Sequence, residues 1–94
     1  GIELNLDQRQ ASLNGQSLKL SPTAFKILEV LLRESPNPVS REKIAQEIWG
    51  DDKPESNSLK VHIFNLRKQL DFAGDKMLLH TVTGFGFSIE EVGS

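Results

Sequence analysis

The sequence contains no cysteine, which excludes a disulfide framework, a thiolate zinc site and a cysteine nucleophile. No apolar run approaches the roughly 20 residues that cross a bilayer, and no signal-peptide pattern opens the chain. Positive charge is not in excess either, because the net charge is −2, whereas non-specific polyanion binders are usually strongly basic. We therefore expect a cytoplasmic protein with no membrane partner.

Size and composition predict one folded domain. The chain has 94 residues, of which 37% are hydrophobic and 26% are charged, and these proportions are typical of a globular domain. Since one domain usually takes roughly 100–200 residues, residues 1–94 are expected to form a single domain or a piece of a longer protein.

Charge is unevenly distributed along the chain. Residues 42–55 carry five acidic and two basic side chains, whereas residues 56–70 carry three basic side chains and no acidic one. An acidic segment is thus followed by a basic segment, and this division is more informative than the total charge.

The first twenty residues predict a small antiparallel sheet. Polar and apolar residues alternate at 3–6 and 16–20, with a third short strand at 11–13. Asn14 and Gly15 join two of these strands, and Asn-Gly favours a type I′ turn because both positions need a positive φ.

Three helices and a hairpin are predicted next. The first helix has Ser21 as its cap and Pro22 as its first residue, and it ends before Pro36. The second is expected over residues 40–50 and the third over residues 56–70. Strands at 78–82 and 87–89 are then joined by a tight turn of Thr83, Gly84, Phe85 and Gly86.

The third predicted helix has two different faces. An apolar stripe faces the core and consists of Leu59, Ile63, Leu66 and Leu70. The remaining surface offers amide, apolar and basic groups: Asn57, Lys60, Val61, Phe64, Asn65, Arg67 and Lys68. Amides can bind adenine edges, Val and Phe can touch thymine methyl groups, and cations neutralise phosphates. The alternative is an ordinary solvated helix that lacks acids by chance.

The order of these elements indicates the fold class. Three helices followed by a hairpin are the layout of a winged helix, in which the second and third helices form a helix-turn-helix. We predict an α+β winged helix-turn-helix with a small N-terminal antiparallel sheet and a C-terminal β-hairpin wing. A hairpin that merely closes the sheet is the plainer alternative.

Four stretches of the chain resemble one family. They are LSPTAFKIL at 20–28, VSRE at 39–42 with IWG at 48–50, residues 56–70, and TVTGFGF at 81–87. Together they resemble the C-terminal effector domain of OmpR/PhoB-type response regulators, and the similarity runs from the first strand to Ile89. The resemblance implies sequence-specific DNA binding, with the third helix in the major groove and the wing on the adjacent backbone or minor groove.

The resemblance also implies roles for individual residues. Base contacts are expected for Asn57, Lys60, Val61, Phe64 and Asn65. Contacts to phosphates or by the wing are expected for Arg41, Trp49, Arg67, Lys68 and Thr83. The loop that often meets RNA polymerase corresponds here to Gly50, Asp51, Asp52, Lys53, Pro54 and Glu55.

Family members usually carry an N-terminal receiver domain that is phosphorylated on an aspartate. The resemblance therefore implies a receiver in cis, a cognate histidine kinase, and binding to tandem half-sites as a homodimer, with no cofactor. The chain departs from the family pattern at three positions. Thr83 and Phe64 stand where many members have a basic residue, and Lys60 stands where many have an acid. We expect modest DNA affinity for the isolated domain.

Enzymatic chemistry finds little support. His62 and His80 are the only histidines, and His62 borders the core stripe, so a packed role is favoured over a catalytic one. Asp51 and Asp52 are adjacent acids in a polar loop, and no dense cluster of ligands predicts a metal site. The remaining alternative is a winged helix used mainly for protein contact, with Val61 and Phe64 as an apolar anchor.

Overall fold

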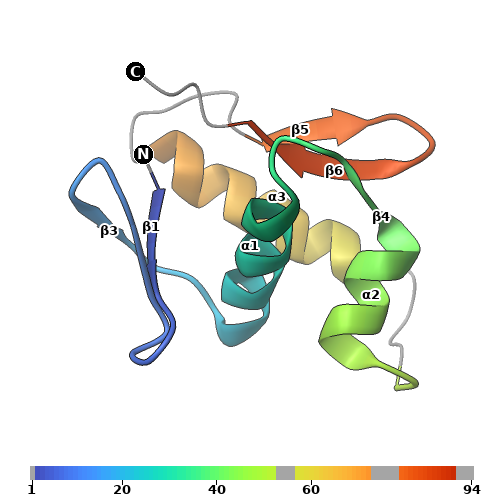
Figure 1. The fold of residues 1–94 in the computed structure, drawn as a ribbon, viewed down its shortest axis with the longest axis horizontal. Helices are drawn as coiled ribbons and strands as arrows, with labels where there is room; N and C mark the ends of the chain where they lie inside the picture. The colour runs from blue at the N-terminus through green and yellow to red at the C-terminus, as the bar shows by residue number, and fades with distance from the viewer. Residues whose placement is uncertain (1, 53–56, 73–78, 91–94) are drawn as a thin grey trace.

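An antiparallel sheet opens the chain, as the alternation predicts (Figure 1). The computed structural model describes residues 2–52, 57–72 and 79–90. Strands β1 (Ile2–Asn5), β2 (Gln10–Leu13) and β3 (Gln16–Leu18) pair in that order. Asn14 and Gly15 have φ values of 52° and 85°, so the predicted turn with two positive φ angles is confirmed.

The first two helices begin at serine caps. The Ser21 hydroxyl accepts a hydrogen bond from the Ala24 N–H at 3.1 Å, and α1 spans Pro22–Glu34. The Ser40 hydroxyl accepts from the Lys43 N–H at 3.1 Å, and α2 spans Arg41–Trp49. Both caps satisfy backbone donors that the helix leaves open, and both predicted helix starts are confirmed.

A second sheet joins the two halves of the chain. Strand β6 (Gly86–Ile89) lies between β5 (Leu79–Val82) and β4 (Val39–Ser40), and it is antiparallel to both. The two-residue strand β4 is not predicted, because it is too short to show alternation. The predicted turn is also wrong at one end, since Gly86 belongs to β6 and pairs with Ser40.

The core is formed by residues from all three helices and both sheets. Helix α3 spans Asn57–Phe72 and so ends two residues later than the sequence predicts. The Ser35 hydroxyl donates to the Ile89 carbonyl at 2.6 Å, which ties the end of α1 to β6. Side chains with no exposed surface come from every layer of the domain: Leu13, Ile27, Leu28, Leu31, Ile44, Leu66 and Ile89. This is the predicted α+β winged-helix architecture.

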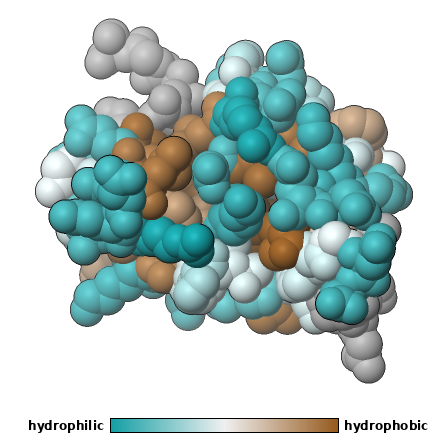
Figure 2. All heavy atoms as spheres, turned by 60° about the horizontal axis from the view of Figure 1, so that its bottom comes forward, coloured by the Kyte–Doolittle hydropathy of each residue, from teal (hydrophilic) through white to brown (hydrophobic). Residues whose placement is uncertain are grey.

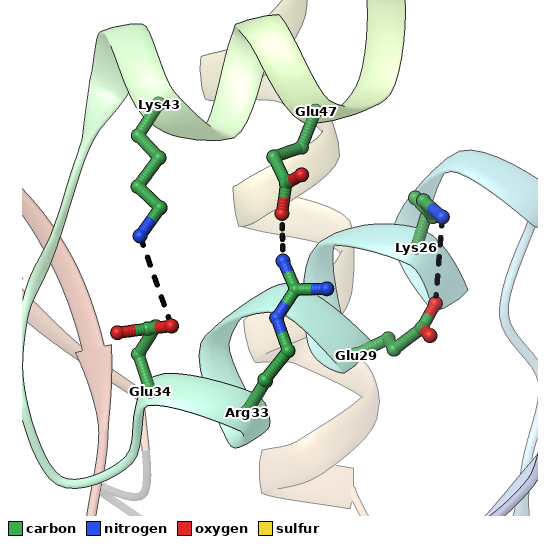
Figure 3. A network of polar contacts seen from close by, with 6 residues as sticks. All are labelled: Lys26, Glu29, Arg33, Glu34, Lys43 and Glu47. Atoms are coloured by element: carbon green, nitrogen blue, oxygen red, sulfur yellow. Dashed lines mark ion pairs between the residues drawn. The ribbon is translucent and has the colours of Figure 1, made fainter.

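Ion pairs link the outer surfaces of α1 and α2 (Figure 3). Arg33 of α1 pairs with Glu47 of α2, and Lys43 of α2 lies 3.7 Å from Glu34 of α1. These side chains are partly exposed, so each pair contributes little to stability. They connect the outer surfaces of α1 and α2, while the Ser40 cap marks where α2 begins.

The ends of the molecule differ in structure. The N-terminal sheet lies at one end, and α2 with the β5–β6 hairpin lies at the other (Figure 1). On the face seen in Figure 2, hydrophilic side chains dominate, and apolar side chains reach the surface in separate places rather than as one continuous patch.

Candidate nucleic-acid interface

Helix α3 buries the apolar stripe that the sequence predicts. Leu59, Ile63, Leu66 and Leu70 are all buried, with exposed fractions of 8% or less. Their spacing of three and four residues places them on one side of the helix. The opposite side of α3, which includes Val61, Phe64 and Asn65, is thereby left exposed.

The exposed side of α3 carries two large apolar residues among polar ones. Val61 is 54% exposed and Phe64 is 62% exposed. The Lys68 ammonium lies 6.0 Å from the centre of the Phe64 ring, within the range of a cation–π contact. Lys60 and Asn65 are also exposed, and Asn57 is the first residue of α3.

A cleft of about 510 Å³ separates α3 from the hairpin and from the start of α2. Three of its lining residues are cations, and none of the described lining residues is acidic. The cleft therefore suits an anionic occupant. Its lining consists of Arg41, Leu59, Lys60, Ile63, Phe64, Arg67, Thr81 and Phe87.

Arg67 spans the inner end of this cleft. Its Nη2 atom donates to the Thr81 hydroxyl at 2.7 Å and to the Leu79 carbonyl at 3.5 Å. The Nε atom is buried and has no hydrogen-bond partner among the described residues. Arg67 is only half-exposed, so it connects α3 to β5 rather than projecting freely into solvent.

Arg41 connects the start of α2 to the same hairpin. Its guanidinium lies 5.5 Å from the centre of the Phe87 ring, and its backbone N–H donates to the Phe85 carbonyl at 3.2 Å. The side chain stays exposed beside the cleft. Its cation is thus held at the entrance by an aromatic ring.

The tip of the hairpin is a short turn. Gly84 has a φ of 76°, a conformation that favours glycine, and the Phe85 N–H donates to the Val82 carbonyl at 2.9 Å. Thr83 is exposed at this tip. Phe87 is buried and anchors the hairpin, whereas Phe85 is 47% exposed.

The end of α2 places Trp49 beside α3. Its ring centre lies 6.2 Å from that of His62, and both residues are half-buried, which agrees with a packed role for His62. After Gly50, the exposed residues Asp51 and Asp52 open the predicted loop. The rest of that loop lies outside the described residues: Lys53, Pro54 and Glu55.

A match to a known protein family identifies the kind of domain that carries this surface. The family described as "Transcriptional regulatory protein, C terminal" matches residues 15–89. The chain belongs to this family. It is an effector domain of the OmpR/PhoB type, as the four sequence stretches indicate, and such domains bind DNA and regulate transcription rather than catalyse a reaction.

Individual relatives agree with this assignment. Regulatory protein VanR of Enterococcus faecium is 36% identical over 94 residues, which cover 97% of this chain and 41% of VanR. The DNA-binding domain of CpxR from E. coli is 32% identical with a TM-score of 0.81, over 98% of this chain and 92% of that domain. The C-terminal domain of the nisin resistance regulator NsrR is 31% identical with a TM-score of 0.82, over 99% and 95% of the two chains.

Two residues that shape the effector domain's cleft are not among the predicted site residues. Thr81 and Phe87 line it, yet they were predicted only as parts of the hairpin. Alternation along β5 places Leu79 and Thr81 on one side of the strand, and this signal was available. The partner of Thr81 was not predictable, since Arg67 is far from it in the sequence.

Within residues 2–52, 57–72 and 79–90, no group of three or more metal-ligating side chains comes together. Over the same residues, no helix is long and apolar enough to span a bilayer.

Proposed function

We propose that the effector domain inserts α3 into the major groove and rests its β5–β6 wing on the adjoining phosphate backbone. The cleft between α3 and the wing supports this proposal most strongly, because its charged residues are all cations: Arg41, Lys60 and Arg67. A duplex presents phosphates on both sides of the major groove. A ridge of base-reading side chains beside a cationic cleft is complementary to that pattern.

The roles divide by chemistry. The groups that meet base edges are Asn57, Lys60, Val61, Phe64 and Asn65. The groups that meet phosphates are Arg41, Trp49, Arg67, Lys68 and Thr83. Arg67 has two tasks in this arrangement, because a guanidinium carries five N–H donors and can bind β5 and a phosphate together.

Selection from random duplexes tests the proposal directly. The domain is mixed with a pool of random duplexes, the bound fraction is amplified and sequenced, and affinity is then followed by fluorescence anisotropy at several salt concentrations. We expect an enriched tandem motif and an affinity that falls steeply with salt, because phosphate contacts release counterions. Absence of enrichment at low salt would contradict base reading by α3.

Truncation of Asn65 is the first prediction for this surface. An exposed amide on α3 can make paired hydrogen bonds with adenine, so Asn65→Ala should weaken binding to the selected site by about 1–3 kcal/mol. Binding to unrelated duplexes should barely change. Anisotropy titrations on both kinds of DNA measure this, and equal losses on both would remove Asn65 from the base contacts.

Truncation of Lys68 should weaken binding to the selected site and to unrelated duplexes alike, unlike truncation of Asn65. We call the exposed side of α3 that carries the proposed base contacts the reading face. The Lys68 ammonium lies over the Phe64 ring at the margin of this face, where a phosphate can reach it. Lys68→Ala should lower affinity for all sequences and reduce the salt slope by about one. An unchanged slope would exclude Lys68 from the phosphate contacts.

The wider regulatory system is also part of the proposal. The chain spans about 41% of VanR, and we expect the remainder of the full-length protein to include a phosphorylated receiver domain served by a histidine kinase in the cytoplasm. Binding to tandem half-sites as a homodimer fits the domain's modest charge, since two copies combine their phosphate contacts. The acidic loop that begins at Gly50 would face a basic surface of RNA polymerase.

A second candidate function rests on Val61 and Phe64. Both are more than half exposed, and a pair of exposed apolar residues is a typical anchor for a protein partner. Salt separates the two candidates, because an apolar anchor gives little salt dependence whereas phosphate contacts give a steep one.

A further inference from the structure

The exposed ring of Phe64 is the least expected group on the reading face of α3. The phenylalanine side chain has no hydrogen-bonding atom, so it cannot form hydrogen bonds with the nitrogen and oxygen atoms on base edges. With 62% of its surface exposed, it nevertheless offers a large apolar area that binding would bury.

The surroundings of the ring identify the kind of surface that covers it. Lys68 lies over the ring, and Phe64 shares the neighbouring cleft with Lys60, Arg41 and Arg67. The described residues that line this cleft include no carboxylate. An exposed apolar group with cations beside it is complementary to an anionic partner that carries a small apolar group of its own.

The major groove offers one such apolar group. Adenine, guanine and cytosine present nitrogen and oxygen atoms there, whereas thymine adds a methyl group at C5. Val61 is also exposed and lies three residues before Phe64, so the two side chains are neighbours on the helix surface. Asn65 follows Val61 by four residues and therefore lies on the same side of the helix as this pair.

We propose that Phe64, supported by Val61, reads the 5-methyl group of thymine and thereby sets a base preference of this domain. This inference rests on the proposed insertion of α3 into the major groove. The ligand class is a pyrimidine methylated at C5, so 5-methylcytosine at the same position should also be accepted by the ring.

The test removes single methyl groups from the DNA. In the enriched duplex, each thymine is replaced in turn by deoxyuridine, which differs only by that methyl group. We expect one or two positions to lose about fourfold in affinity, the amount that corresponds to one buried methyl group. If the selection enriches a duplex but no replacement of its thymines changes affinity, this inference is overturned and the proposed function stands.

A variant then assigns the methyl contact to the ring. Phe64→Ala should bind the thymine and deoxyuridine duplexes equally, because the group that senses the methyl is gone. Phe72→Ala is the matched control, since Phe72 is 80% exposed on the same helix but lies about 12 Å further along its axis. It should keep the full thymine preference. A preference that persists in Phe64→Ala would overturn the assignment.

Methylated cytosine gives an independent check. At the sensitive position a C·G pair should bind weakly, and methylation of that cytosine should recover about fourfold of the loss in the wild-type domain but none in Phe64→Ala. Recovery in both proteins would overturn the role of the ring. A domain that enriches no duplex at all would instead refute the insertion of α3.

Discussion

Replacing Gly86 by alanine is expected to destabilise the domain by about 3 kcal/mol or more, because the added methyl group has no space. A Cβ atom at this position would overlap the Val39 carbonyl oxygen and lie 2.8 Å from the Cα atom of Ser40. Both obstacles are backbone atoms of β4, so no side-chain rotation relieves them. Urea unfolding of the wild type and of Gly86→Ala measures the difference in the free energy of unfolding.

Gly84→Ala is the matched control for this prediction. Gly84 has a positive φ of 76°, but a Cβ atom there would meet nothing within 4 Å. The substitution should lower the free energy of unfolding by only about 1–2 kcal/mol, which is the cost of placing a residue with a Cβ atom in a left-handed conformation. Equal destabilisation by the two variants would show that the close approach of β4 and β6 is not what requires glycine at position 86.

Truncating Leu66 should have the second large effect. Leu66 is fully buried at the centre of the α3 stripe, where truncation leaves a cavity between α3 and its neighbours. Leu66→Ala should lower the free energy of unfolding by about 2–5 kcal/mol. This is a large part of the total, because a typical domain has a free energy of unfolding of about 5–15 kcal/mol. Thermal unfolding followed by circular dichroism measures it.

Val61→Ala is the control on the exposed face of the same helix, although it removes one carbon atom fewer than Leu66→Ala. Because Val61 is 54% exposed, its truncation should change stability by no more than about 0.5 kcal/mol. If both variants were destabilised alike, the division of α3 into a core face and a reading face would be wrong.

The predictable parts of this domain depend on local signals. Ser21 and Ser40 mark the helix starts, Asn14-Gly15 marks a turn, and the spacing of apolar residues in α3 separates its buried face from its exposed one. Each signal lies within a few residues of the structure it specifies. The candidate base-reading residues of α3 follow from the same spacing.

The features that were missed depend on contacts between distant segments. Strand β4 exists because Val39 and Ser40 pair with β6, and Gly86 belongs to a strand rather than a turn for the same reason. Arg67, a basic side chain on a helix flank, was predicted only as a phosphate contact. Its hydrogen bonds to β5 could not be predicted, because they depend on how the hairpin packs against α3.

The double attachment of the hairpin has a consequence for how sequences are discriminated. Arg67 fastens it to α3, and the backbone bond from Arg41 fastens it to α2, so the distance between the helix and the hairpin is set during folding. The entropy of ordering these parts is lost before DNA arrives, which favours affinity. With α3 and the hairpin placed on DNA as proposed, we expect this spacing to make the duplex adjust its groove width instead. Base steps that deform easily should therefore be favoured even at positions that no side chain touches.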